Sequence, residues 1–360
     1  MKKKLVSILV CTLLIGTGTV VIADWSPGDG YKMHYPQEPD PNGWDVDWGN
    51  WTLADDWRCT ECGTVTDFHF WISWWHDQEF DIPKIQIAIW SNNPGTEYSM
   101  PEEELWNRTF YPEDFVISDP WDGEQGWYNP VIGEWELNNH FKYFQINIMD
   151  IDEPFKQFES EIYWLVIKMP FNSNIIGWKT SISDQFMDTA VYGLSDGNWV
   201  PIYEPINGSK LDLSFVINGE PAIPDLTCNG SFIWDKKIKP GDTLTGTFRV
   251  CNEGETCSKL NWEIDLTKPS FGEWQFTPSN GILESGNCVT VNINFVAPSN
   301  ESRLYTGRIK VFNSNDPTDF CYINVSLQTT RPRSLNVGFL QILFERFPTV
   351  FVIFRNILGF

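Results

Sequence analysis

The sequence predicts an all-β protein built from two β-sandwiches that are joined by a short linker. Two observations predict this fold class. Short segments of alternating apolar and polar residues recur along the chain, and Gly, Pro, Asn and Asp separate them. Long helical periodicity is absent before the last segment. A stretch rich in Pro and Gly at 219–224 follows a predicted strand, so we expect the boundary between the modules there.

The second module, 220–330, contains the clearest strands. The alternating runs are Leu244–Val250, Leu260–Leu266, Val289–Phe295, Tyr305–Val311 and Cys321–Leu327, with short strands near Ser231–Trp234 and Trp274–Phe276. Alternation places one face of each strand inward and the other outward. About seven strands in about 105 residues are the size and rhythm of an immunoglobulin-like sandwich.

The first module, 24–219, is richer in aromatic residues and has weaker boundaries. Strands are predicted at Asp67–Trp75, with aromatic residues on both faces, at Lys84–Trp90, at Ile162–Met169 and at Leu211–Ile217. Because helix signals are weak, we expect a jelly-roll-like sandwich.

The N-terminal segment 1–23 has the pattern of a secretory signal peptide. Lys2–Lys4 precede an apolar run from Leu5 to Ile22, and cleavage after Ala23 would leave Asp24 as the first residue. The alternative is a transmembrane anchor, which Gly16 and several Thr residues disfavour. The sequence therefore predicts a secreted, extracellular protein, associated with the cell surface.

The C-terminal segment 331–360 is strongly apolar. Pro348 separates two stretches that we expect to be short helices. A membrane span needs about 20 apolar residues without charges, and Glu345, Arg346 and Arg355 interrupt such a run. We predict an attachment or self-association element, because a free apolar tail in water aggregates. The alternative is a frayed hydrophobic tail.

The composition excludes one class of partner and points to another. The net charge is -23, and removal of the three N-terminal lysines makes it -26, which repels nucleic acid and anionic lipid. The chain has 19 Trp, mostly in the first module. Exposed rings could stack on extracellular or cell-envelope glycans, and buried rings would only fill a core. The candidate ligand-binding residues are Trp71, Trp74, Trp75, Trp127 and Trp178.

The cysteines suggest disulfides, because exported thiols tend to oxidise. Cys228 opens the first strand of the second module and Cys321 begins its last, so we predict that they pair. Cys59-Thr60-Glu61-Cys62 is a CxxC motif, which could be redox-active or half of a zinc site. Without a second CxxC or a βαβ context, a local disulfide is preferred. Among the others we would pair Cys251 with Cys257.

No motif identifies a catalytic residue. A glycosidase needs two carboxylates across a cleft, but with 48 acidic residues some pair will always be available. Acidic turns could bind structural calcium, and Asp55 and Asp56 are the candidate ligands, although acidic turns are usually only solvated. Six Asn-x-Ser/Thr sequons are candidate glycosylation sites. They begin at Asn50, Asn107, Asn207, Asn229, Asn300 and Asn324.

Both modules resemble domains of surface proteins. The second carries Asn252-Glu253-Gly254, Leu260-Asn261-Trp262, Trp274–Pro278, Tyr305-Thr306-Gly307 and Asn313–Asp316. It resembles immunoglobulin-like spacer modules of large archaeal and bacterial surface proteins. The first carries Asp24–Gly30, Ala54–Trp57 and Gly177–Lys179. It resembles an uncharacterised, secreted, Trp-rich domain of environmental archaea and bacteria. The resemblance implies a structural or recognition role and no catalytic residues.

The sequence therefore predicts a non-catalytic secreted or cell-surface protein, glycan-binding or adhesive, with a spacer module and an attachment tail. The alternatives are a secreted polysaccharide-active enzyme that uses carboxylates of the first module, and a structural surface-layer component.

Overall fold

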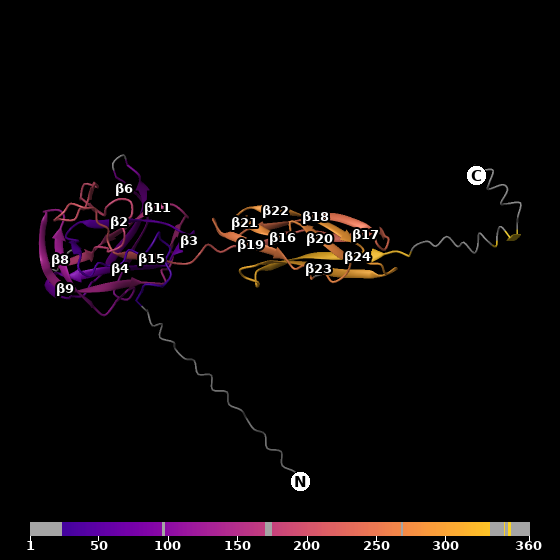
Figure 1. Ribbon diagram of the computed structural model, residues 1–360, viewed down its shortest axis with the longest axis horizontal. Helices are drawn as coiled ribbons and strands as arrows, with labels where there is room; N and C mark the ends of the chain where they lie inside the picture. Colours follow the sequence, from indigo (N-terminus) through magenta and orange to yellow (C-terminus); the bar gives the residue numbers. More distant parts are fainter. Residues whose placement is uncertain are drawn as a thin grey trace, which may run out of the picture. The chain divides into compact units, whose positions relative to one another are not determined.

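The computed structural model describes residues 24–95, 98–169, 175–267 and 269–331, together with Ile342, Glu345 and Arg346, and only the backbone of 235–237. The predicted signal peptide and most of the predicted helical tail lie outside the described residues. The chain divides into two compact units between Pro221 and Ala222 (Figure 1). Within the described residues, no helix is long and apolar enough to cross a membrane.

The first unit is built from strands in two large sheets and a small one. The strands are β1 (Trp44–Asp47), β2 (Thr52–Arg58), β3 (Gly63–Val65), β4 (Asp67–Trp74), β5 (Ile85–Asn93), β6 (Met100–Phe110), β7 (Val116–Ile117), β8 (Trp121–Asn129), β9 (Glu134–Ile148), β10 (Phe155–Gln157), β11 (Ile162–Lys168), β12 (Ile176–Lys179), β13 (Val191–Gly193), β14 (Trp199–Pro201) and β15 (Phe215–Asn218). The seven-stranded sheet has the order β15-β4-β12-β1-β8-β9-β7, and the six-stranded sheet has the order β14-β13-β2-β11-β5-β6. β3 pairs with β10, and a 3₁₀ turn, η1 (Trp75–Asp77), follows β4.

The two large sheets enclose one aromatic core, which gives this unit its sandwich architecture. Phe68, Phe70 and Ile72 of β4 face Leu165 and Ile167 of β11 within this core. The four segments predicted as strands in this unit are strands, although the last begins only at Phe215. The all-β prediction is therefore confirmed here.

The seven-stranded sheet also closes on itself around a polar cluster. The end of β9 pairs with β4 and its beginning pairs with β8, so β4, β12, β1, β8 and β9 form a ring. One buried polar side chain comes from each strand: Ser73, Lys179, Asp45, Gln125 and His140. The Asp45 carboxylate lies 3.2 Å from Lys179 Nζ and 2.9 Å from His140 Nε2. Since all three side chains are inaccessible to solvent, we interpret the cluster as structural.

The second unit is a sandwich of a four-stranded and a five-stranded sheet. The strands are β16 (Leu226–Asn229), β17 (Ser231–Ile238), β18 (Thr243–Asn252), β19 (Lys259–Ile264), β20 (Glu273–Thr277), β21 (Asn280–Glu284), β22 (Cys288–Val296), β23 (Leu304–Asn313) and β24 (Phe320–Thr329). The sheets have the orders β16-β18-β22-β20 and β17-β24-β23-β19-β21. All seven strands expected here are present. β21 was not predicted, and the chain forms two strands, β16 and β17, where the sequence predicted a first strand that opens at Cys228. Leu266 lies beyond β19 with 67% of its surface exposed.

The chain passes from one sheet to the other at Gly230, between β16 and β17. Its φ of +155° lies where side chains other than glycine are strained, and a Cβ atom there would lie 2.7 Å from Cβ of Phe248. Glycine therefore allows two consecutive strands to belong to opposite sheets.

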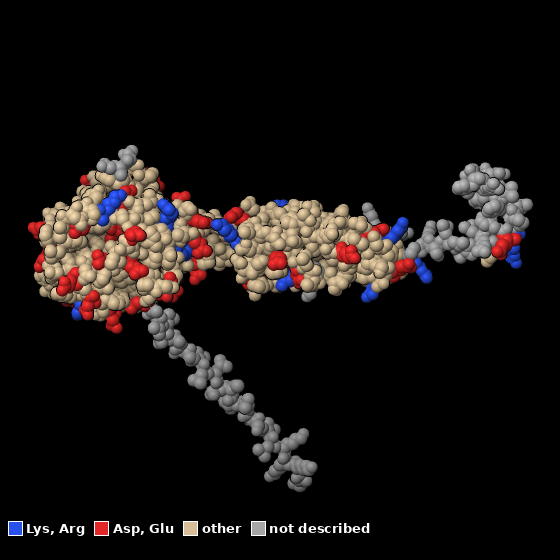
Figure 2. All heavy atoms as spheres, in the orientation of Figure 1, with Lys and Arg blue, Asp and Glu red and all other residues tan. Residues whose placement is uncertain are grey.

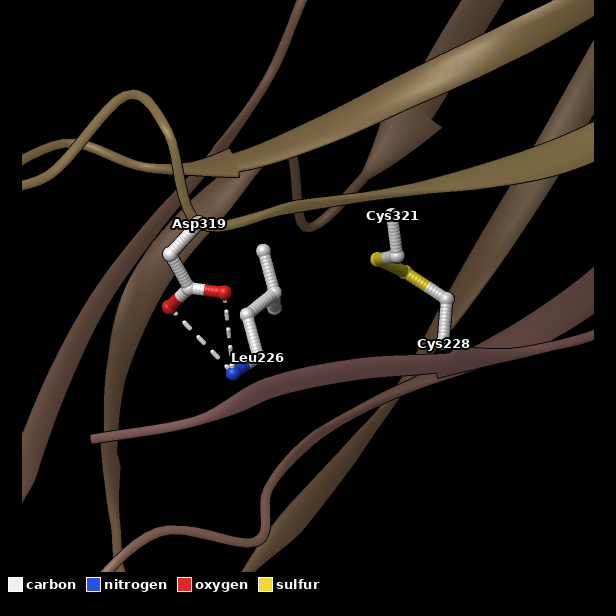
Figure 3. The surroundings of a disulfide bond; sticks show 4 residues. All are labelled: Leu226, Cys228, Asp319 and Cys321. Atoms are coloured by element: carbon white, nitrogen blue, oxygen red, sulfur yellow. Dashed lines mark hydrogen bonds between the residues drawn. A yellow bond between two sulfur atoms is a disulfide. The ribbon is translucent and has the colours of Figure 1, made fainter.

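The disulfides agree with the prediction in one case and contradict it in two. Cys228 of β16 is bonded to Cys321 of β24, which joins the two sheets, and the nearby Asp319 carboxylate accepts a hydrogen bond from Leu226 N (Figure 3). Cys251 pairs with Cys288, not with Cys257. These two residues are directly opposite each other on β18 and β22, which sequence spacing could not reveal.

The predicted disulfide within the CxxC motif is wrong. Cys59 is a free, buried thiol. Its side chain lies against the main core, and burial raises its pKa to about 11. The thiol therefore stays protonated and unreactive in the folded protein.

Candidate functional site

Three of the five tryptophans expected to bind a ligand lie inside the main core. Trp71, Trp74 and Trp178 are at most 4% exposed. Trp178 stacks on Trp48 at 5.5 Å between ring centroids, and Trp25 covers Trp71 at 6.2 Å. Since β4 and β12 are covered on both faces, no face of these three rings is free for a ligand. The prediction that they bind one is wrong.

The other two, Trp75 and Trp127, contact each other. Their rings meet edge to face at 5.2 Å. Trp127 is buried, whereas Trp75 is half-buried. Both line a small cavity on the seven-stranded sheet, so the structure brings together only these two of the five candidates.

The outer face of the six-stranded sheet carries a second, small apolar cluster. Ile87 and Leu165 point into the main core, so the adjacent Ala88 and Val166 point away from it. Val166 is paired with Ala88 on one side and with Ala54 on the other. These small side chains leave room above the middle of the sheet.

A groove of about 450 Å³ opens above this cluster. Trp90 of β5 and Trp199 of β14 line it and contact each other edge to face, with 5.7 Å between ring centroids. Gly193 lies directly opposite Trp199 on the neighbouring strand. A Cβ atom at Gly193 would lie 2.9 Å from the indole ring, so glycine is required for this ring position.

Polar side chains complete the groove. Gln86, Asn107, Lys168 and Glu104 line it, and all four are exposed. Asn107 also donates a hydrogen bond to Glu104. An apolar floor with a few polar groups at a volume of about 300–1,000 Å³ is typical of a ligand site. This surface, which we call the Trp90–Trp199 groove, is the candidate functional site.

The sequence pointed to only part of this groove. The alternation in Lys84–Trp90 already separates Ile85, Ile87 and Ile89 from Ala88 and Trp90, so Trp90 could have been recognised as facing away from the core. Trp199 could not, because only the sheet order brings β14 to this face.

A comparison with protein families identifies the family to which most of this unit belongs. The family described as "Domain of unknown function (DUF7901)" matches residues 33–218, slightly more than half of the chain. The chain belongs to the DUF7901 family.

Comparisons with individual proteins add little to this. The chain is similar to the solved ASH / PapD-like domain 7 of human CEP192, with 16% identity and a TM-score of 0.24, over 32% of this chain and 92% of that one. It is also similar to the Vibrio cholerae VesB protease, with 7% identity and a TM-score of 0.20, over 79% of this chain and 96% of that one. Neither similarity is close enough to carry an argument. No curated protein matches the chain.

The DUF7901 domain carries most of the charge of the protein. Residues 24–221 contain 9 basic and 35 acidic residues, a net charge of -26, and residues 222–331 contain 10 and 12, a net charge of -2. Figure 2 shows acidic side chains spread over the visible face of this unit. Such a field attracts cations and repels anionic ligands.

Three buried aspartates of the DUF7901 domain lie close together. Burial, and then the charges of Asp212 and Asp56, raise the pKa of Asp55 well above its usual value. Burial and then Asp212 do the same for Asp56, and burial raises the pKa of Asp212 to about 7. Asp55 Oδ2 accepts hydrogen bonds from Gln37 Nε2 at 2.9 Å and from Leu213 N at 2.6 Å.

These carboxylates do not fit the predicted calcium ion. Asp55 and Asp56 are consecutive in β2, so their side chains point to opposite faces of the sheet. Calcium takes six to eight oxygen ligands around one point. Among the described residues, no group of three or more His, Cys, Asp or Glu is placed to hold a metal ion.

The asparagines of the six Asn-x-Ser/Thr sequons are all exposed, which glycosylation requires. Asn107 is distinct among them because it also lines the Trp90–Trp199 groove. A glycan on Asn107 would occupy the space that a ligand needs.

Proposed function

We propose that the DUF7901 domain is a non-catalytic carbohydrate-binding module of a secreted or cell-surface protein. The second unit would act as a spacer, and the C-terminal segment as an attachment or assembly element. The observation that carries this proposal is the Trp90–Trp199 groove, in which indole rings and exposed amide and charged groups surround an apolar floor. Indole faces stack on the C–H faces of sugar rings, while amides and charged groups bind hydroxyls.

The charged groups of the groove favour binding over hydrolysis. Glycoside hydrolysis uses two carboxylates on either side of the bond. Among the described residues that line the groove, Glu104 is the only carboxylate. The groove therefore has binding groups without the pair that the reaction needs.

Two further features support an extracellular location. The disulfides Cys228–Cys321 and Cys251–Cys288 persist in oxidising compartments. The strongly acidic surface of the DUF7901 domain suits a soluble extracellular partner of low negative charge, such as a neutral polysaccharide.

The proposal is tested by affinity electrophoresis of the full chain in gels that contain xylan, mannan or β-glucan. We expect retardation by at least one polymer, and about tenfold weaker binding for Trp90→Ala and Trp199→Ala. Trp121→Ala is the matched control, because Trp121 is 38% exposed and does not line the groove. Mobility that no polymer changes, or equal retardation of all variants, would contradict the proposal.

Polysaccharide hydrolysis is the second candidate, and one observation favours it. Asp212, with its pKa raised by burial to about 7, lines a polar cavity of about 350 Å³ together with Glu204 and Trp44. A carboxyl group with such a pKa can act as a general acid near neutral pH. However, Phe186 N and Gln185 Nε2 already donate hydrogen bonds to Asp212. Release of reducing ends by the full chain, lost in Asp212→Asn, would favour this candidate over binding alone.

A further inference from the structure

A second cavity in the DUF7901 domain differs in chemistry from the groove. It measures about 260 Å³ and lies on the seven-stranded sheet. Three tryptophans, Trp75, Trp127 and Trp135, line it together with the polar residues Asp47, Asn129, Glu134 and Glu136. Trp75 comes from η1 and Trp127 from β8, and their rings form an edge-to-face corner at 5.2 Å. We call this the Trp75–Trp127 cavity.

The strand register brings the acidic side chains to the same corner. On β9, Glu136 is paired with Trp127, and Glu134 is paired with Asn129. Asp47 enters from β1, and Asn129 Nδ2 donates a hydrogen bond of 2.8 Å to its Oδ2 atom. Three carboxylates and three indoles therefore share one small cavity.

Among the described residues, the carboxylates of this cavity have no strong cationic partner. Asp47 accepts hydrogen bonds from two neutral donors, Gly49 N at 2.9 Å and Asn129 Nδ2, and burial raises its pKa. His76 Nε2 lies 3.6 Å from Glu136 Oε2, where both side chains are about half exposed. Within the described part of the chain, no Lys or Arg lines the cavity.

We propose that the Trp75–Trp127 cavity binds an alkylammonium group. Cations are attracted to the faces of indole rings within about 6 Å, and the attraction is larger where the cation is desolvated. The three carboxylates add charge attraction at short range. An inorganic ion is the weaker candidate, because indole rings supply no oxygen ligands and the described residues hold no metal-binding group of three.

The small volume restricts the ligand to a compact head group. Ligand pockets for larger molecules begin at about 300 Å³, which exceeds this cavity. A quaternary ammonium head group and the protonated amine of an amino sugar are the two sources of this chemistry. The inference does not depend on carbohydrate binding in the Trp90–Trp199 groove, because the two sites share no lining residue.

Isothermal titration calorimetry of the full chain tests the inference with choline and with glucosamine. The neutral controls are 3,3-dimethyl-1-butanol, which has the shape of choline without its charge, and glucose. We expect saturable binding of a cation and at least tenfold weaker binding of its neutral counterpart. Binding of choline alone assigns the quaternary source, and binding of glucosamine alone assigns the amino sugar.

Variants locate the site. Trp75→Ala should weaken binding about tenfold, and Glu136→Gln, an exposed change that leaves the core intact, should weaken it severalfold. Trp199→Ala is the matched control and should bind like the unchanged chain. Absence of saturable binding to both cations, equal binding of the neutral controls, or unchanged binding in Glu136→Gln would overturn the inference.

Discussion

At the scale of single residues, the buried aspartates fall into two kinds that differ in their partners. Burial by itself would raise the pKa of Asp45, but the adjacent Lys179 and His140 bring it below the usual value. Asp55 and Asp212 have neutral hydrogen-bond donors instead, and burial raises the pKa of both. The charged form of the first kind is stabilised by its ion-pair partners, whereas ionisation of the second kind destabilises the folded state.

The pH dependence of stability follows from the second kind. The pKa of Asp212 is near its ordinary value of 3.8 in the unfolded chain and about 7 in the folded one. Its contribution to stability is therefore fully present below about pH 4 and is lost as the pH rises through about 7. Between about pH 8 and pH 5 we expect the melting temperature of the first unit to rise by several degrees.

Asp212→Asn isolates this effect. The amide keeps the shape of the carboxyl group and cannot ionise, so the variant should be more stable than the unchanged chain at about pH 8 and should lose much of the rise on acidification. Asp196→Asn is the control, because Asp196 is exposed and lies in a turn. A variant with the full pH dependence would show that other groups cause it.

At the scale of strands, the Cys228–Cys321 disulfide joins β16 to β24 across the two sheets of the second unit. It spans 93 residues of sequence, and a loop of this length stabilises by about 4–5 kcal/mol in the chain-entropy model. The double variant Cys228→Ala/Cys321→Ala should therefore melt at least about 15 °C lower in the second unit. Thermal unfolding followed by circular dichroism measures this shift, and a change of only a few degrees would contradict it.

The alternation of apolar and polar residues made the strands predictable. It could not show whether the second face of a strand is exposed or buried. Ile85, Ile87 and Ile89 identify β5 because the period of two depends only on neighbours in the sequence. For β4, the same pattern cannot tell an exposed face from one covered by a distant segment, and Trp25 covers Trp71 from the N-terminal end of the unit. For this reason the tryptophans chosen from the sequence are mostly core residues.

The Trp90–Trp199 groove could not be predicted from the sequence for a related reason. Trp90 and Trp199 lie on β5 and β14, strands that are far apart in the sequence and separated within one sheet by β11, β2 and β13. Sheet order depends on long-range pairing, which local patterns do not encode. Similarly, Cys251 and Cys288 are joined by the register of β18 and β22, and not by their spacing.

At the scale of the whole molecule, the two units differ in what stabilises them. The first has a large aromatic core, a charge of -26 and buried aspartates with raised pKa values. The second has a smaller core, almost no net charge and a disulfide between its sheets. A change of pH should therefore act on one unit, and loss of a disulfide on the other.

Differential scanning calorimetry of the full chain tests this separation. Because each unit has its own core, we expect two transitions. Acidification should raise one of them, and the same transition should lose that response in Asp212→Asn. Cys228→Ala/Cys321→Ala should lower only the other. If both perturbations moved a single transition, the two cores would unfold as one cooperative unit, and the spacer role proposed for the second unit would lose its basis, since a spacer must be stable without the domain that it carries.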